Sequence, residues 1–383
     1  MIEAARSGSG LVSGLKQAAL AVAVLVSLCP QAAFAATPPV PAYRVDAHWP
    51  RPLPHNWIMG QVGGVAIDSQ DHVWVLQRPR SLTADVLGAA GTPPHTECCA
   101  AAPSVLEFDT AGNLLRSWGG PDFVPDWPKN EHAIRVDKGG NVWISGNNST
   151  DRQVIKFSAD GKQLLEIGHP SDAPTNNQDT GLLGKPAGID IDEAAHEVYI
   201  ADGYLNSRVV VYDSDTGAFK RGWGAYGVPL DQIANARPPA YVPGAPPAKQ
   251  FSTVHCATLS PDGLVYVCDR LNDRIQVFTK AGRFVKEFVL RPATIGGSAF
   301  AIAFSHDKAQ TYLLLADGMN ELVSVLRRED GVEVAQIGHG GRNAGQFLGP
   351  HGLVTDANGN LYVGEWIGQR MQKFVLQIGG RVR

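Results

Sequence analysis

A unit of about 45 to 55 residues recurs six times along the chain, and this repeat constrains the fold more than any other feature. Each copy reads as a short apolar strand, a turn with Asp or Ser, an aromatic-rich strand, and two further strands joined by a Gly turn. Segments such as Val73-Trp-Val and Val142-Trp-Ile alternate β-branched and aromatic residues, as is typical of strands packed face to face. The first strands start at Gly63, His132, Ala187, His255, Phe300 and His351. The repeat predicts an all-β fold, a six-bladed β-propeller.

The sixth copy lacks a fourth strand. Its third strand ends near Phe374-Val-Leu-Gln-Ile378, where the pattern stops. An extended stretch at 42–48 precedes the first copy and can pair with that third strand, which would close the ring and remove an exposed sheet edge. We therefore expect a propeller over 60–378, an N-terminal segment with the closing strand over 36–59, and a C-terminal tail over 379–383.

Residues 1–35 have the pattern of a secretory signal peptide. A basic stretch precedes an apolar run from Ala18 to Cys29, and Ala33-Phe-Ala35 supplies a small-residue cleavage site. We expect an exported protein, periplasmic or secreted, and a monomer. No other stretch is long and apolar enough for a membrane-spanning helix. The net charge of -4 gives no basic face for nucleic acid.

Two long insertions, 79–103 and 224–250, are expected on one face of the ring, because strand direction in an antiparallel meander fixes where each loop lies. This upper face is the one where the first strands begin. Long loops on the rim of a rigid scaffold commonly carry function. The first insertion is predicted to form a lid with His95, Cys98 and Cys99. The two cysteines could pair or act as metal-binding or redox thiols, and His95 could add a metal ligand.

Histidine occupies one register in alternate copies. His132, His255 and His351 each stand five residues before the Asp or Ser that ends the first strand of copies two, four and six. First strands line the channel of a propeller, so three imidazoles at one height would converge with nearly threefold geometry. Three neutral histidine nitrogens with an open position are typical of catalytic zinc. We predict a zinc site at the upper mouth; the alternative is three channel-lining histidines in contact with water.

The second strands end at the same rim, and their last residues include Arg78, Tyr204 and Arg270. A guanidinium fork matches a carboxylate, and a phenol near a divalent cation has a lowered pKa and can transfer a proton. These residues predict an anionic substrate; strand-end packing and surface ion pairing are the alternatives. The recurring pairs Asp202–Arg208 and Asp269–Arg274 are interpreted as braces within the blades.

Cys256 and Cys268 flank a Ser-Pro-Asp-Gly hairpin symmetrically, and should lie opposite each other on paired strands. That spacing is compatible with a disulfide, and two buried thiols would fit as well.

Several of these segments resemble NHL-type propellers, and in particular the lyase domain of the peptidylglycine α-amidating enzymes. The segments are Gly60-Gln-Val-Gly-Gly-Val65, Gln77-Arg78, Ala201-Asp-Gly-Tyr-Leu-Asn-Ser-Arg208, Cys268-Asp-Arg-Leu-Asn-Asp-Arg-Ile-Gln276 and Gly349-Pro-His-Gly352. The resemblance implies a reaction that removes glyoxylate from a C-terminal α-hydroxyglycine and leaves a peptide amide.

The resemblance also implies residue roles. The three histidines would hold zinc, Tyr204 would be the base, and Arg78 and Arg270 would steady the carboxylate. A structural calcium ion would bind the main-chain carbonyls of Val65 and Ile134. Gly352 stands where the family has a carboxylate, and Leu205 and Tyr266 stand at two of its cysteine positions.

The leading expectation is a zinc-dependent carbon–nitrogen lyase acting on a small carboxylate-bearing or peptide-derived substrate, an N-linked α-hydroxy acid. A metal-dependent esterase or lactonase is the second, since the same zinc could lower the pKa of a bound water. The third is a non-enzymatic periplasmic interaction scaffold.

Overall fold

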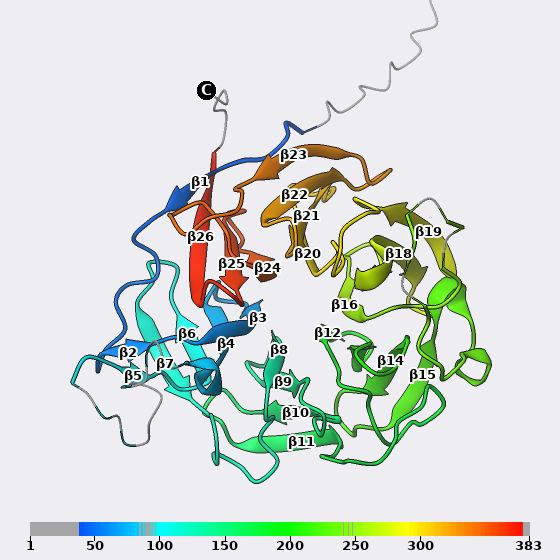
Figure 1. Cartoon of the computed structure of the whole chain (residues 1–383), viewed down its shortest axis with the longest axis horizontal. Coiled ribbons are helices and arrows are strands. Elements are labelled where there is room, and N and C mark those ends of the chain that lie inside the picture. Colours follow the sequence, from blue (N-terminus) through cyan, green and yellow to red (C-terminus); the bar gives the residue numbers. More distant parts are fainter. Residues whose placement is uncertain are drawn as a thin grey trace, which may run out of the picture. The chain divides into compact units, whose positions relative to one another are not determined.

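The computed structural model describes residues 38–377, except positions 84, 85, 87, 89–92, 94, 96, 240, 244 and 247. The predicted signal peptide and C-terminal tail lie outside the described residues. Within this part, six four-stranded antiparallel sheets surround a central channel, as the sequence predicted (Figure 1). No helix of the described residues is both long and apolar enough to cross a membrane.

The blades follow one another along the chain, with the first strand of each nearest the axis (Figure 1). Blade 1 contains β3 (Gln61–Ile67), β4 (Val73–Arg78), β6 (Val105–Phe108) and β7 (Leu114–Trp118). Blade 2 contains β8 (Glu131–Val136), β9 (Val142–Gly146), β10 (Gln153–Phe157) and β11 (Gln163–Gly168). Blade 3 contains β12 (Gly188–Asp192), β13 (Glu197–Asp202), β14 (Arg208–Asp213) and β15 (Phe219–Trp223). Blade 4 contains β16 (Val254–Leu259), β17 (Leu264–Asp269), β18 (Arg274–Thr279) and β19 (Phe284–Val289); blade 5 contains β20 (Ala301–Phe304), β21 (Tyr312–Asp317), β22 (Leu322–Arg327) and β23 (Glu333–Ile337); blade 6 contains β24 (Pro350–Thr355), β25 (Leu361–Glu365) and β26 (Arg370–Gln377).

The ring closes through the N-terminal strand. β1 (Ala42–Asp46) pairs antiparallel with β26, from Ala42 opposite Gln377 to Asp46 opposite Lys373. Blade 6 thereby gains its fourth strand, and the predicted closure is confirmed. Every blade then has two neighbours on which to pack.

Aromatic side chains of the second strands fill the spaces between blades. Trp74, Trp143, Tyr199, Tyr266 and Tyr362 are all buried. They belong to apolar clusters that combine strands of adjacent blades, which is how a sheet with two apolar faces is stabilised.

The predicted braces are confirmed, and they also reach the first strands. Buried Asp202 pairs with Arg208 at 2.8 Å, and buried Asp269 pairs with Arg274 at 2.7 Å. The other carboxylate oxygen of Asp269 accepts the Ser252 N–H at 2.6 Å, three residues before His255. Glu365 accepts the Leu348 N–H at 2.7 Å, three residues before His351. Asp269, and Glu365, which pairs with Arg370 at 2.7 Å, therefore fix the approach to two of the three histidines.

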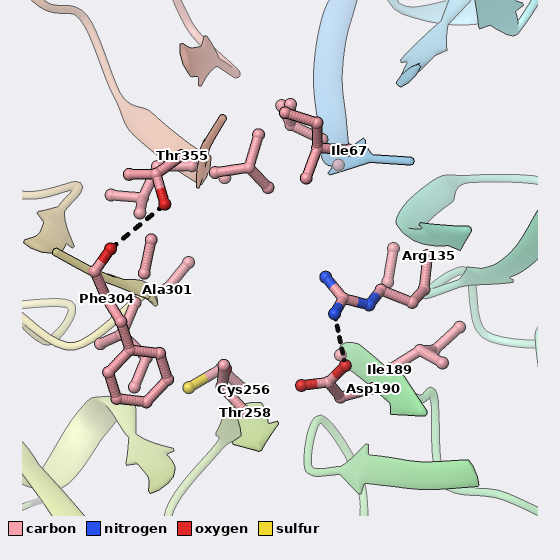
Figure 2. Close-up of a pocket in the computed structure, with 18 of the residues that line it drawn as sticks. Ile67, Arg135, Ile189, Asp190, Cys256, Thr258, Ala301, Phe304 and Thr355 are labelled. Carbon is pink, nitrogen blue, oxygen red and sulfur yellow. Dashed lines mark hydrogen bonds and ion pairs between the residues drawn. The ribbon is translucent and has the colours of Figure 1, made fainter. Parts of the chain in front are cut away.

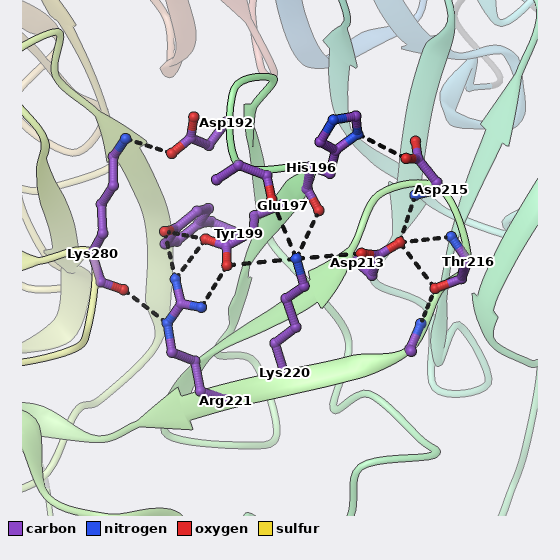
Figure 3. Close-up of polar contacts among 12 residues, drawn as sticks. Asp192, His196, Glu197, Tyr199, Asp213, Asp215, Thr216, Lys220, Arg221 and Lys280 are labelled. Atoms are coloured by element: carbon purple, nitrogen blue, oxygen red, sulfur yellow. Dashed lines mark hydrogen bonds and ion pairs between the residues drawn. The ribbon is translucent and has the colours of Figure 1, made fainter.

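Adjacent blades are also joined by polar clamps away from the channel, and Figure 3 shows the one between blades 3 and 4. The Arg221 guanidinium binds Glu197 through two bonds of 2.7 and 2.6 Å, and its Nε donates to the Lys280 carbonyl at 2.9 Å. The hydrogen bonds from Arg221 lower the pKa of Glu197 to about 2. The arginine thus ties two blades together, and its donors are committed to that task.

The described part of the first insertion lies at the outer edge of blade 1 (Figure 1). There β5 (Ala100–Ala101) pairs in parallel with β2 (Trp57–Ile58). His95 and Cys98 are exposed, and Cys99 is partly buried beside Cys98. The predicted lid role of these residues stays a prediction.

Candidate metal centre

The three predicted histidines meet in the channel. The ring centroids of His132, His255 and His351 lie 4.8 to 5.1 Å apart, and one ligand atom from each falls within 4.8 Å of the others. The rings stand 72 to 79° to one another, so the arrangement is close to threefold. All three side chains are buried. The three side chains converge as expected and could hold a metal ion, and the predicted zinc site stays a prediction.

A β-bulge carries each histidine. The strand register shifts between Glu131 and Ala133, between Val254 and Cys256, and between Pro350 and Gly352, so that each histidine is the extra residue. A bulge re-aims one side chain without changing the rest of the strand. It turns residues of the innermost strands toward the axis, where they can share one ion.

The neighbouring odd-numbered blades orient the imidazoles. The Nδ1 atom of His132 lies 2.9 Å from the Ala187 carbonyl oxygen, and that of His255 lies 2.7 Å from the Phe300 carbonyl oxygen. His351 is bonded in the same way to the main chain of Gly63. A carbonyl can only accept, so Nδ1 carries the proton and Nε2 keeps its lone pair. Metal-binding histidines are commonly oriented like this.

Burial keeps the three rings neutral. It is the main cause that lowers the pKa of His255 to about 3 and that of His132 and His351 well below the ordinary value. The positive charges of Arg78 and Arg270 act in the same direction on His255. Neutral imidazole is the form that binds a metal ion, so protons compete weakly at this site.

The Tyr204 phenol faces the histidine cluster. Its oxygen lies 2.9 Å from Nε2 of His132 and 3.1 Å from Nε2 of His255. Burial raises the pKa of Tyr204, and the charges of Arg270 and Arg78 oppose that rise. The phenol therefore adjoins the position that the three histidines leave open. Lys185, which sequence reasoning missed, lies with its amino group 5.8 Å from the centre of the Tyr204 ring.

The two predicted arginines flank the phenol, and each is positioned by main-chain carbonyls. Arg78 is buried and donates from Nε to the Glu131 carbonyl, while its Nη1 donates to Gln61 at 2.9 Å. Arg270 donates from Nε to the Gly296 carbonyl at 2.9 Å, and its Nη1 lies 3.5 Å from the Tyr204 oxygen.

The Arg270 guanidinium also lies over the Phe300 ring, 4.0 Å from its centre. Neither Arg78 nor Arg270 forms an ion pair with a carboxylate of the described residues. Both retain charge for an anion beside Tyr204.

Cys256 and Cys268 lie opposite each other, as predicted. They are paired in register, with Cα atoms 4.8 Å apart, a separation that a disulfide can span. Cys256 directly follows His255, and Cys268 precedes Arg270 by two residues. Cys98 and Cys99 form a second close pair.

Below the histidines, the channel contains a cavity of about 530 Å³ that the first strands of all six blades line (Figure 2). An ion pair lies on one side of it: Arg135 of blade 2 lies 2.9 Å from Asp190 of blade 3. The other oxygen of Asp190 accepts the Leu259 N–H of blade 4 at 2.7 Å. These charges are satisfied within the protein.

Calcium fits this channel less well than a transition metal fits the histidines. Calcium requires several oxygen ligands. Val65, Ile134 and Gly352 line the cavity, but Gly352 offers no carboxylate, and Arg135 brings a positive charge into the same space. The binding of calcium by the Val65 and Ile134 carbonyls stays a prediction.

A second group of possible ligands lies in blade 1 and is already engaged. Asp68, His72 and Glu107 offer atoms within 4.8 Å of one another. The Trp74 indole donates to Asp68 at 2.9 Å, His72 bonds Glu107 at 2.8 Å, and Arg116 lies 3.1 Å from Glu107. These contacts describe a polar network within the blade.

Comparison with known proteins gives the same picture. No protein family model matches the chain. It is 27% identical over 337 residues to peptidyl-glycine alpha-amidating monooxygenase of Mus musculus. The aligned region covers 83% of this chain and 30% of that protein. It is 28% identical over 289 residues to peptidyl-alpha-hydroxyglycine alpha-amidating lyase 2 of Drosophila melanogaster, covering 71% of this chain and 60% of the relative. The resemblance predicted from the sequence is confirmed.

Two further comparisons bear on the fold. NHL repeat-containing protein 3 of Homo sapiens is 26% identical over 350 residues, covering 87% of this chain and 84% of that protein. A solved streptogramin B lyase aligns with a TM-score of 0.52 at 14% identity, over 88% of this chain and 98% of that one. At that identity the structure supports the propeller fold alone. The chain spans less than a third of the mouse monooxygenase, so the activity of that whole protein does not transfer to it.

Proposed function

We propose that this protein is a zinc-dependent lyase that cleaves the C–N bond of an N-linked α-hydroxy acid and releases glyoxylate. The observation that carries the proposal is the position of the Tyr204 oxygen, which lies within 3.1 Å of two imidazole Nε2 atoms. Beside it are two arginines that have no carboxylate partner in the part of the chain that the structure describes. The relatives named as amidating lyases support the same reaction. The donor set of three neutral histidines fits zinc.

Zinc bound to His132, His255 and His351 would supply Lewis acidity that lowers the pKa of the substrate hydroxyl. Arg78 and Arg270 bind the substrate carboxylate and orient the carbon that carries the hydroxyl. Tyr204, which bound zinc and the two arginines would favour as the phenolate against the effect of burial, takes the hydroxyl proton. The C–O bond becomes a carbonyl as the C–N electron pair moves to nitrogen. Tyr204 then gives the proton to that nitrogen, so the products are an amide and glyoxylate.

The proposed compartment follows from the predicted signal peptide: the protein is exported to the periplasm or secreted. Disulfides persist in such compartments. We propose that Cys256–Cys268 and Cys98–Cys99 are bonded there, which mass analysis with and without a reductant would establish. We propose that the protein acts there as a monomer. Its substrate would be a small carboxylate-bearing or peptide-derived compound outside the cytoplasm.

The test combines metal analysis with an assay. Purified protein should contain about one zinc ion per chain and release glyoxylate from α-hydroxyhippurate. Tyr204→Phe should keep the metal and lose about 10²- to 10⁴-fold in rate, the usual contribution of a positioned acid–base group. Zinc without glyoxylate release would reject the lyase and favour the metal-dependent hydrolase. Protein purified without metal, and unable to bind it, would favour the scaffold.

A further inference from the structure

A rigid loop packs directly on Arg270. It follows β19 and runs from Leu290 to Ser298, and its Gly296 carbonyl accepts the Arg270 Nε–H at 2.9 Å. Gly296 and Gly297 have φ values of +87° and +86°, which favour glycine. A Cβ atom at Gly297 would lie 2.2 Å from the Arg270 carbonyl oxygen. The loop is therefore built to approach this arginine closely.

The same loop frames a second cavity, of about 500 Å³. Its lining residues are Arg291, Pro292, Ala293, Thr294, Ile295, Met319 and Asn320. Ile295 is 90% exposed and Met319 is 42% exposed. Two large apolar side chains at one depression are typical of a binding surface, because their exposure to water is unfavourable.

The polar groups of this cavity are already engaged. Arg291 pairs with Asp317 at 3.2 Å and with Glu333 at 2.6 Å. The Asn320 amide donates to the Thr294 hydroxyl at 3.0 Å. These contacts hold the loop in place and leave the apolar side chains as the surface that a ligand would meet.

The cavity lies close to the candidate active site, because Met319 follows the end of β21 as Arg270 follows the end of β17, on the same rim of the ring. A Cβ atom at Gly296 would lie 2.9 Å from the Met319 methyl carbon, so the thioether rests on the residue whose carbonyl holds Arg270. Arg270 in turn lies 3.5 Å from the Tyr204 oxygen. A substrate with its carboxylate at Arg270 and its scissile bond at Tyr204 has its acyl part close to this depression.

We propose that Ile295 and Met319 form an apolar subsite for the group attached to the amide carbonyl of the substrate. The inference rests on the proposed function and deepens it. It assigns the substrate class as N-acyl or peptidyl α-hydroxyglycines in which a large apolar group, aromatic or branched, precedes the hydroxy acid. A pocket of this kind distinguishes ligands by the apolar surface that they bury.

The test compares α-hydroxyhippurate, which carries a benzoyl group, with N-acetyl-α-hydroxyglycine. Wild type should prefer the benzoyl substrate by about tenfold in kcat/KM, the scale on which apolar pockets discriminate. Ile295→Asp and Met319→Asp should bring that ratio close to one, mainly through KM, and Met319→Leu should restore it. Leu164→Asp is the matched control, because Leu164 is similarly exposed but belongs to β11 of blade 2.

The outcomes separate the two proposals. Equal use of both substrates by wild type, or an unchanged preference in the Asp variants, would overturn the subsite and leave the lyase intact. If wild type releases glyoxylate from neither compound, the lyase proposal fails. The subsite is then decided by calorimetry with hippurate and acetylglycine: tighter hippurate binding that the Asp variants lose supports it, and equal binding rejects it.

Discussion

The even-numbered and odd-numbered blades have the same strands but different functions at the channel. At the equivalent sequence position, blades 2, 4 and 6 present His132, His255 and His351, whereas blades 1, 3 and 5 present Gly63, Ala187 and Phe300. The even blades supply ring nitrogens, and each following odd blade supplies the carbonyl that orients one of the rings. The same repeat therefore has two complementary roles at the channel: the even blades carry the candidate metal ligands, and the odd blades carry the carbonyl groups that orient them.

This division explains which substitutions the odd blades tolerate. A carbonyl acceptor does not depend on the side chain, so glycine, alanine and phenylalanine can all occupy the supporting position. The histidine position has no such freedom, since only its side chain could reach a shared ion.

The largest effect is expected from His255→Ala. It leaves two ring nitrogens, so the protein should lose its metal and with it all glyoxylate release above background. Ala187→Gly, the matched change in an odd blade, keeps the carbonyl and should keep about one metal ion per chain. Metal analysis of both purified variants checks this, and full metal content in His255→Ala would contradict the division.

The braces give the next contrast. Asp202→Asn leaves buried Arg208 without a carboxylate partner among the described residues and should lower the free energy of unfolding by about 3–5 kcal/mol. Asp269→Asn should lower it less, because Arg274 keeps Glu287 at 3.3 Å. Only Asp269 also fixes the approach to a histidine. Asp269→Asn should therefore weaken metal binding as well, measured by competition with a chelator. Equal metal affinity in the two variants would show that the brace acts on stability alone.

The pH dependence of the metal-free protein offers a third test. The pKa of His255 is about 3 when folded, below its ordinary value of 6.5. Between these values the unfolded chain binds a proton at His255 that the folded chain does not, so the contribution of His255 to the free energy of unfolding should rise with pH from about 3 to 6.5 and then level off. His255→Gln should make the pH dependence shallower without abolishing it, because burial also lowers the pKa of His132 and His351. Phe300→Leu, in the adjacent odd blade, should leave it as it is; identical curves for both variants would refute the assignment.

The smallest effect is expected from Phe300→Leu in the assay. It removes the ring beneath Arg270, a contact worth about 0.5–2 kcal/mol, and it keeps the carbonyl that orients His255. KM for a carboxylate substrate should rise by about 2- to 30-fold while the metal stays bound. Loss of metal from this variant would show that the odd-blade side chain does more than support Arg270.

Much of this arrangement could be predicted from the sequence because it repeats. The six first strands, the alternate histidines, the closing strand and the opposed Cys256 and Cys268 all follow from spacing that a propeller converts directly into position. The families named by the comparisons match the ones that the motifs indicated.

The bulges could not be predicted. An extra residue in a strand appears only when its partners are known, and His132 gives the same sequence pattern with or without it. The carbonyl acceptors, the Phe300–Arg270 contact and the Arg135–Asp190 pair join different blades, so they depend on how neighbouring sheets pack.

The closing strand has a consequence for assembly. His351 belongs to the blade that β1 completes, so the earliest described strand and the last must meet before the third ligand has a settled environment. Such a pairing between distant parts of a chain forms slowly during folding. During synthesis, His132 and His255 would be made well before His351 and β26. The site would therefore gain its full affinity for metal only at the final step, when β1 pairs with β26 and closes the ring.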